Sequence, residues 1–140
     1  MHEFPDALAV VQATAPDEPV TLVRPHAAER AARFFTENFR GKTLYAVKAN
    51  PSPALLRTLW RAGVTHYDVA SIAEVRAARS ALPQAKLCFM HPVKAESAIR
   101  EAYERHGVRT FSLDGHEELE KILRATDNAA DLDLFVRIRV

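Results

Sequence analysis

Lys48 is the residue of this sequence whose type and place most clearly suit covalent chemistry. It ends the run Leu44–Lys48, which has the short apolar pattern of a β-strand. Side chains alternate along a strand, so Tyr45 and Val47 share one face while Ala46 and Lys48 share the other. If the first face packs against helices, Lys48 points into the space that the strands enclose. Burial lowers the pKa of a lysine and makes it a nucleophile toward carbonyl groups, chiefly through Schiff bases. A lysine at a strand end also commonly reaches into water.

The strand that carries Lys48 belongs to a regular series. Strand-like runs begin near residues 20, 44, 66, 87, 110 and 134, and each of the first five is followed by helical periodicity. Such alternation predicts a parallel sheet with right-handed crossovers. Because no G-x-G-x-x-G turn is present, the pattern favours a (β/α) barrel over a dinucleotide-binding sheet.

The series stops before a barrel would close. About five βα units and a sixth strand are expected, whereas a closed barrel has eight units. The last strand would then leave an open edge. Three explanations fit: a fragment of a longer protein, completion by a partner, or a smaller open sheet.

Enzymes with a (β/α) barrel carry their reactive groups at the carboxyl ends of the strands. The regular spacing of the expected strands is enough to identify the residues at those ends. They are Arg24, Lys48, Asp68, Met90, His91, Asp114, Arg137 and Arg139.

Each of these candidates has a structural alternative. Asp68 could tune the charge of a Schiff-base lysine, or it could be a solvated aspartate at a loop start. Ser71 and Glu74 have the S-x-x-E spacing of a helix capping box, which explains Glu74 without a site role. Arg137 and Arg139 share one face of an apolar strand and need anionic or aromatic partners, unless that face is exposed at the sheet edge.

Two further residues are better explained by structure than by chemistry. His91 is an isolated histidine, and Asp114 fits a helix N-cap. No group of His, Cys, Asp or Glu has the spacing of a metal site, so no metal is expected.

Composition narrows the class of protein. The 140 residues have the length of one domain, and a net charge of +1 gives no basic field for nucleic acid. Cys88 lies in an apolar run, as expected for a small buried hydrophobe in a reducing compartment. No apolar run has membrane-spanning length and the N-terminus does not resemble a signal peptide, so the cytosol is the expected location.

Several motifs together resemble one known family, the fold-type III pyridoxal-phosphate (PLP) decarboxylases, which act on ornithine, lysine, arginine or diaminopimelate. The similarity runs from about Val20 to Val140, and the pairing of Y-A-V-K-x-N with D-V-A-S-x-x-E at this spacing is its most specific part. The segments that carry it are Tyr45–Pro51, Tyr67–Glu74, Phe89–Lys94, Gly107–Asp114, Glu117–Ile122 and Phe135–Ile138. The H-P-V-K form is most similar to bacterial ornithine decarboxylases.

The resemblance implies a role for five residues. Lys48 matches the lysine that holds the cofactor as a Schiff base, and Ala46 matches a small residue against the cofactor ring. Asp68 and Glu74 match two acids near the Schiff base, and Arg137 matches an arginine that lines the cofactor pocket. The implied fold is the first part of a PLP-binding (β/α)8 barrel of the alanine racemase type.

The resemblance also implies a whole protein longer than this sequence. Residues 1–19 would be an N-terminal extension and residues 20–140 the first part of the barrel domain, without the C-terminal β domain. The family forms homodimers with shared sites, so we expect the 140 residues alone to be inactive. The implied reaction is decarboxylation of a basic amino acid, most simply L-ornithine to putrescine in polyamine biosynthesis. Diaminopimelate, lysine or arginine decarboxylation, or a non-catalytic truncated homologue that pairs with a full-length enzyme, are alternatives.

Overall fold

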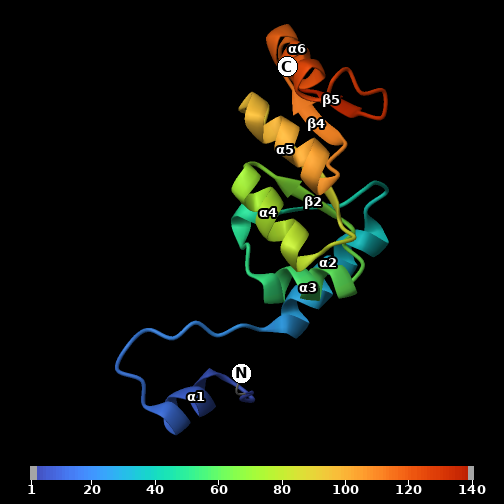
Figure 1. Cartoon of the computed structure of the whole chain (residues 1–140). Coiled ribbons are helices and arrows are strands. Elements are labelled where there is room, and N and C mark those ends of the chain that lie inside the picture. Colours follow the sequence, from blue (N-terminus) through green and yellow to red (C-terminus); the bar gives the residue numbers. More distant parts are fainter. Residues whose placement is uncertain (1–2, 139–140) are drawn as a thin grey trace.

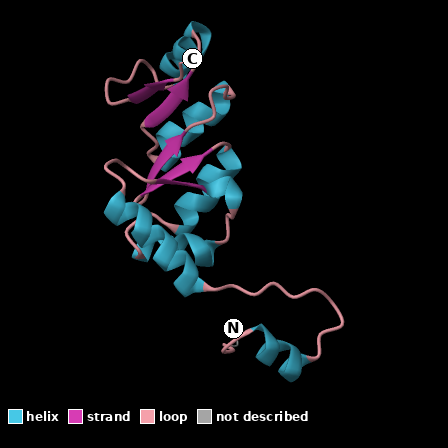
Figure 2. Cartoon of the chain, turned by 180° about the vertical axis from the view of Figure 1, so that it is seen from behind, coloured by secondary structure: helices cyan, strands magenta, loops and turns pink. Residues whose placement is uncertain are grey.

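Five parallel β-strands form one sheet in the structure, a computed structural model that describes residues 3–138. The strand order β1-β2-β3-β4-β5 follows the sequence, so each crossover joins neighbouring strands. Figures 1 and 2 show α1 and the extended segment after it lying away from the sheet. In chain order the elements are α1 (Ala7–Thr14), α2 (Pro25–Asn38), β1 (Leu44–Ala46), the 3₁₀ turn η1 (Val47–Ala49), α3 (Pro53–Arg61), β2 (His66–Val69), α4 (Ile72–Ala81), β3 (Lys86–Phe89), α5 (Glu96–His106), β4 (Thr110–Leu113), α6 (His116–Ala125) and β5 (Asp133–Val136).

This architecture confirms the predicted α/β fold with a parallel sheet of consecutive βα units. Among residues 3–138, no helix has both the length and the apolar character needed to cross a bilayer.

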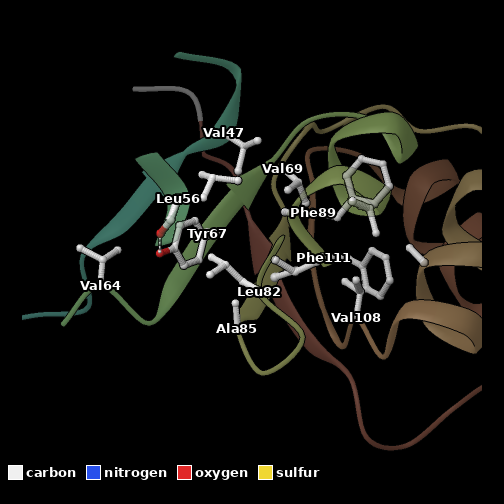
Figure 3. Packing of buried hydrophobic residues seen from close by; sticks show 14 of the residues in the cluster. Val47, Leu56, Val64, Tyr67, Val69, Leu82, Ala85, Phe89, Val108 and Phe111 are labelled. Carbon is white, nitrogen blue, oxygen red and sulfur yellow. Dashed lines mark hydrogen bonds between the residues drawn. The ribbon is translucent and has the colours of Figure 1, made fainter. Parts of the chain in front are cut away.

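One face of the sheet forms the hydrophobic core with the helices that follow the strands. Alternate residues of β2, β3 and β4 point to this face and are buried. In β4 the residues between them, Thr110 and Ser112, are buried as well. The Tyr67 hydroxyl, within this core, donates a hydrogen bond to the Leu56 carbonyl at 3.2 Å (Figure 3). Burial of one such large side chain contributes about 1.5–3 kcal/mol. The fully buried members of the core include Leu56, Tyr67, Val69, Val75, Phe89, Ile99, Phe111 and Ile122.

Glycine ends the helix that leads into β4. Gly107 has a φ of +64°, in the left-handed region, and its N–H donates to the Ala102 carbonyl. The next residue, Val108, also donates to Ala102, at 2.9 Å. This arrangement satisfies a carbonyl at the end of α5 and turns the chain toward β4.

The first predicted strand, over residues 20–23, is not formed, and that prediction was wrong. The segment has no regular structure, and Val20, Leu22 and Val23 are 54%, 46% and 61% exposed. These residues favour a strand, but β propensity reflects packing against a neighbouring strand. The strand order places none of this segment beside β1, so its backbone has no partner among the described residues.

Three smaller boundaries also differ from the prediction. The strand expected over Leu44–Lys48 ends at Ala46, because pairing with β2 ends there and the chain enters η1. The strand expected over 134–140 is β5 (Asp133–Val136), with residues 139 and 140 outside the described part. Asp114 is not the N-cap of α6, because this helix starts at His116 and Gly115 takes the capping position.

Candidate active site

Lys48 lies in a short turn that is fixed on both sides. Val47 before it is fully buried, and the Tyr45 hydroxyl donates to the Asn50 carbonyl at 3.3 Å. Lys48 itself is exposed, because β1 is the edge strand and only β2 pairs with it. The turn therefore presents the amine at the carboxyl end of β1, as predicted, but at an open edge of the sheet and not in an enclosed space.

Ala46 and Asp68 are direct neighbours across β1 and β2. They are paired in the strand register and therefore lie on the same face of the sheet. The methyl group of Ala46 leaves space on this face beside the acid. Asp68 is partly buried, and this burial raises the pKa of its carboxyl group. The charges of Lys48 and Glu74 also act on Asp68, the lysine lowering its pKa and the glutamate raising it. The structure thus brings together Lys48, Ala46, Asp68 and Glu74.

Glu74 is the second half of a capping box at the start of α4. The Ser71 hydroxyl accepts a hydrogen bond from the Glu74 N–H at 3.2 Å and donates to the Glu74 Oε1 at 3.3 Å. The other oxygen, Oε2, accepts from the Ala70 N–H at 3.0 Å. The capping interpretation is therefore confirmed. It also fixes the carboxylate close enough to Asp68 to influence that residue's titration, so capping and a site role are compatible.

Arg137 is separated from these four residues. It follows β5 and its N–H donates to the Leu113 carbonyl at 2.8 Å. Since β1 and β5 are the two edges of the sheet, β2, β3 and β4 lie between Arg137 and Lys48. The side chain of Arg137 is exposed, and Arg139 lies outside the described residues.

The remaining strand-end candidates do not join the cluster. His91 is exposed, and its Nδ1 accepts from the Val93 N–H at 3.2 Å. Arg24 precedes α2 and follows no strand, and Asp114 is exposed. In the described part of the chain, no three His, Cys, Asp or Glu side chains are grouped as a metal ion would require.

A cluster of buried charged side chains that lies beside β3 and β4 was not predicted from the sequence. Lys94 and Glu118 form an ion pair, and Lys121 contacts the same carboxylate. One sequence signal could have located it: Glu118 shares a helical face with Ile122 and Ala125, and all three are buried. An acid on the apolar face of a helix requires a buried partner.

Comparison with known proteins identifies the family. The family model described as "Pyridoxal-dependent decarboxylase, pyridoxal binding domain" matches residues 25–140. The chain belongs to this family. Its cofactor is therefore pyridoxal phosphate, and the expected resemblance to PLP-dependent decarboxylases of basic amino acids is confirmed.

The relatives of this pyridoxal-binding domain include decarboxylases with different named substrates and an antizyme inhibitor. It is 33% identical over 102 residues to a lysine/ornithine decarboxylase of Selenomonas ruminantium, covering 72% of this chain and 25% of the relative. It is 36% identical over 100 residues to an ornithine decarboxylase of Neurospora crassa, covering 71% and 20%. Antizyme inhibitor 2 of Homo sapiens is 31% identical over 91 residues, covering 64% and 19%. The chain thus spans a quarter or less of the length of these relatives.

The fold agrees with a solved structure of the same family. The crystal structure of a lysine decarboxylase from Selenomonas ruminantium matches with a TM-score of 0.80 and 28% identity, covering 100% of this chain and 38% of the other. The five-stranded sheet is therefore the first part of a decarboxylase barrel.

The residues around Asp68 fit a pyridoxal group. A Schiff base needs an accessible amine, and Lys48 is exposed at a fixed turn. An acid beside this amine stabilises its charged form, and Asp68 is close enough for the two charges to interact. The small side chain of Ala46 leaves room on the same face for a flat ring.

Proposed function

We propose that this chain is the cofactor-binding part of a PLP-dependent decarboxylase that acts on a basic amino acid, with L-ornithine as substrate and putrescine as product. The observation that carries the proposal is the position of Lys48. Its amine is exposed at the carboxyl end of a parallel strand, and the partly buried Asp68 follows on the next strand. This edge is where barrel enzymes hold their reactive groups.

Five residues would form this part of the site. Lys48 would hold the cofactor aldehyde as a Schiff base, and Ala46 would lie against the ring. Asp68 would stabilise the positive charge of the Schiff base, with its own ionisation tuned by burial and by Glu74. Arg137 would contribute a positive charge to the cofactor pocket.

The bound cofactor would supply an electron sink for the electrons left when carbon dioxide departs. The protein's contribution is position and charge. The fixed turn at Lys48 orients the amine, and the capping bonds at Ser71 and Ala70 keep the Glu74 carboxylate near Asp68. Lys48 is also the group able to accept or return a proton when the substrate amine replaces it.

The choice of ornithine rests on the motifs and the names of relatives. The H-P-V-K segment is most similar to bacterial ornithine decarboxylases, and two of the relatives described above carry ornithine in their names. Lysine, arginine and diaminopimelate remain the competing substrates.

We further propose the division into an extension (1–19) and a barrel part (20–140), a homodimeric whole enzyme, a cytoplasmic location and a role in polyamine biosynthesis.

A non-catalytic role is the second candidate, because antizyme inhibitor 2 is among the relatives. In that case the chain would be a homologue that pairs with a full-length decarboxylase. The presence of both Lys48 and Asp68 favours the enzyme, since a binding module requires neither.

Reduction with borohydride in the presence of PLP tests the proposal on the longest product of the gene that encodes this chain. We expect a phosphopyridoxyl group on the peptide containing Lys48. The Lys48→Ala variant should lose this label, whereas the control Lys42→Ala, which removes an exposed lysine just before β1, should retain it. Carbon dioxide release should be fastest with ornithine among the four amino acids. Equal labelling of Lys42 and Lys48 would contradict the role of Lys48.

The isolated 140-residue chain provides a further comparison. We expect it neither to hold the cofactor tightly nor to turn over ornithine, because Lys48 lies at an open edge. Absorbance of a protein-bound Schiff base together with ornithine turnover by the isolated chain would show that the other parts are dispensable.

A further inference from the structure

A cluster of three charged side chains lies beside the ends of β3 and β4. Lys94 Nζ is 2.9 Å from Glu118 Oε1, and Lys121 Nζ is 2.6 Å from Glu118 Oε2. The side chains of Lys94 and Glu118 are only 0% and 5% exposed. Burial opposes ionisation of Glu118, but the hydrogen bonds from both lysines outweigh it and lower its pKa. Because a buried ion pair is a poor source of stability, its presence suggests a positional role.

Lys94 connects three parts of the fold. Its ammonium group donates to the His91 carbonyl at 2.9 Å and to the Ser112 carbonyl at 2.6 Å, in addition to its contact with Glu118. Its backbone N–H donates to Glu118 at 3.2 Å, and its carbonyl accepts from Lys121 at 2.9 Å. The loop after β3, the end of β4 and helix α6 are therefore joined at one side chain.

The end of β4 has hydrogen bonds both to Lys94 and to the residue that follows β5. Ser112, whose carbonyl Lys94 holds, also donates its hydroxyl to the Met90 carbonyl at 2.7 Å. The next carbonyl, that of Leu113, accepts the Arg137 N–H at 2.8 Å. Two consecutive carbonyls of β4 thus bind Lys94 and Arg137.

We propose that Lys94 is a positioning residue for Arg137. By fixing the end of β4 it sets the position of the Arg137 backbone, and through it the affinity for the cofactor phosphate or ring. Lys94 is fully buried and does not itself contact the ligand. The proposal rests on the proposed function, in which Arg137 lines the cofactor site.

Cofactor titrations of the longest gene product test this coupling. Lys94→Met keeps most of the length of the side chain, removes the donors to His91 and Ser112, and leaves Glu118 paired with Lys121. The Kd for PLP should rise about tenfold, as is typical when a group supporting a binding residue is lost. In an Arg137→Ala background the same change should raise the Kd less than about twofold, since the residue that Lys94 positions is gone. The control Lys86→Met removes an exposed ion pair with Asp133 and should leave the Kd unchanged.

A purely structural role for Lys94 predicts a different result. Equal fold-changes in the two backgrounds, or an unchanged Kd in Lys94→Met, would overturn the proposal. Glu118→Gln serves as a second variant if Lys94→Met does not fold, and it should show the same dependence on Arg137. Wild-type protein that fails to bind PLP would instead reject the proposed function, so the two failures are distinguishable.

Discussion

Two lysines lie at the carboxyl side of the sheet, and their surroundings are opposite. Lys48, after β1, is exposed, and it acts on the carboxylate of Asp68 through its charge. Lys94, after β3, is fully buried and donates to two carbonyls and one carboxylate. Lys48 therefore has an amine available for reaction, whereas every donor of Lys94 is already used.

The different surroundings of Lys48 and Lys94 show which lysine can react with a carbonyl compound. An amine reacts with an aldehyde only when its lone pair is accessible in the neutral form. Burial lowers the pKa of Lys94, but its two hydrogen bonds to carbonyls and its ion pair with Glu118 leave no route for a carbonyl compound. A lowered pKa is thus insufficient, and accessibility selects Lys48.

Unfolding experiments should separate the two lysines most strongly. Lys94→Ala removes one partner of a buried ion pair and leaves the carbonyls of His91 and Ser112 without a donor, so we expect a loss of about 3 kcal/mol. Lys48→Ala changes an exposed side chain and should alter the free energy of unfolding by less than about 0.5 kcal/mol. Urea denaturation of both variants beside wild type measures this. Equal losses would contradict the contrast between a buried, fully bonded Lys94 and an exposed Lys48.

Chemical labelling should give the next largest difference. Reductive methylation with formaldehyde and cyanoborohydride modifies accessible amines, so Lys48 and the exposed Lys42 should react at similar rates. Lys94 should react at least about a hundredfold more slowly, since its amine is reached only when the local structure opens. Mass spectrometry of peptides over time gives each rate, and labelling in denaturant is the control that abolishes the difference. Rapid modification of Lys94 in native protein would show that its network opens easily.

Local patterns were sufficient to predict most of the sheet. The strands β2, β3 and β4 have apolar residues that alternate or run together between glycine and proline signals, and each was expected within two residues of its observed start. The segment Val20–Val23 has the same kind of composition, yet it forms no strand. Composition reports that a residue suits a sheet, whereas pairing depends on which segment lies beside it.

The sequence predicted one part of the site and not another. Lys48 follows β1, Asp68 lies near the end of β2, and Glu74 is in the first turn of α4, directly after β2. The regular spacing of strands and helices along the sequence was enough to place all three at the carboxyl side of the sheet. The role of Lys94 depends on Ser112 and Glu118, which lie 18 and 24 residues further along the chain. No local pattern joins these three, so the buried network became apparent only in the folded structure.

The two acids beside these lysines should respond oppositely to substitution by the neutral amide. Asp68 has a pKa raised above 3.8, mainly by burial, so its ionisation opposes folding at neutral pH. Asp68→Asn should therefore raise the free energy of unfolding slightly at pH 7, by on the order of 0.5 kcal/mol. The gain should vanish as the pH falls through the raised pKa, because Asp68 is then protonated in wild type as well.

Glu118→Gln is the matched control with the reverse sign. The pKa of Glu118 is lowered below 4.5, so its contribution to stability is present above that pH and is lost as the pH falls through the lowered value. The variant should be less stable than wild type at pH 7, and the two should converge in acid. Thermal unfolding of wild type and both variants between pH 7 and 3 measures these differences. If both amides destabilised the protein at pH 7, Asp68 would have to be a satisfied structural acid like Glu118, and the contrast between an open reactive cluster and a closed structural one would fail.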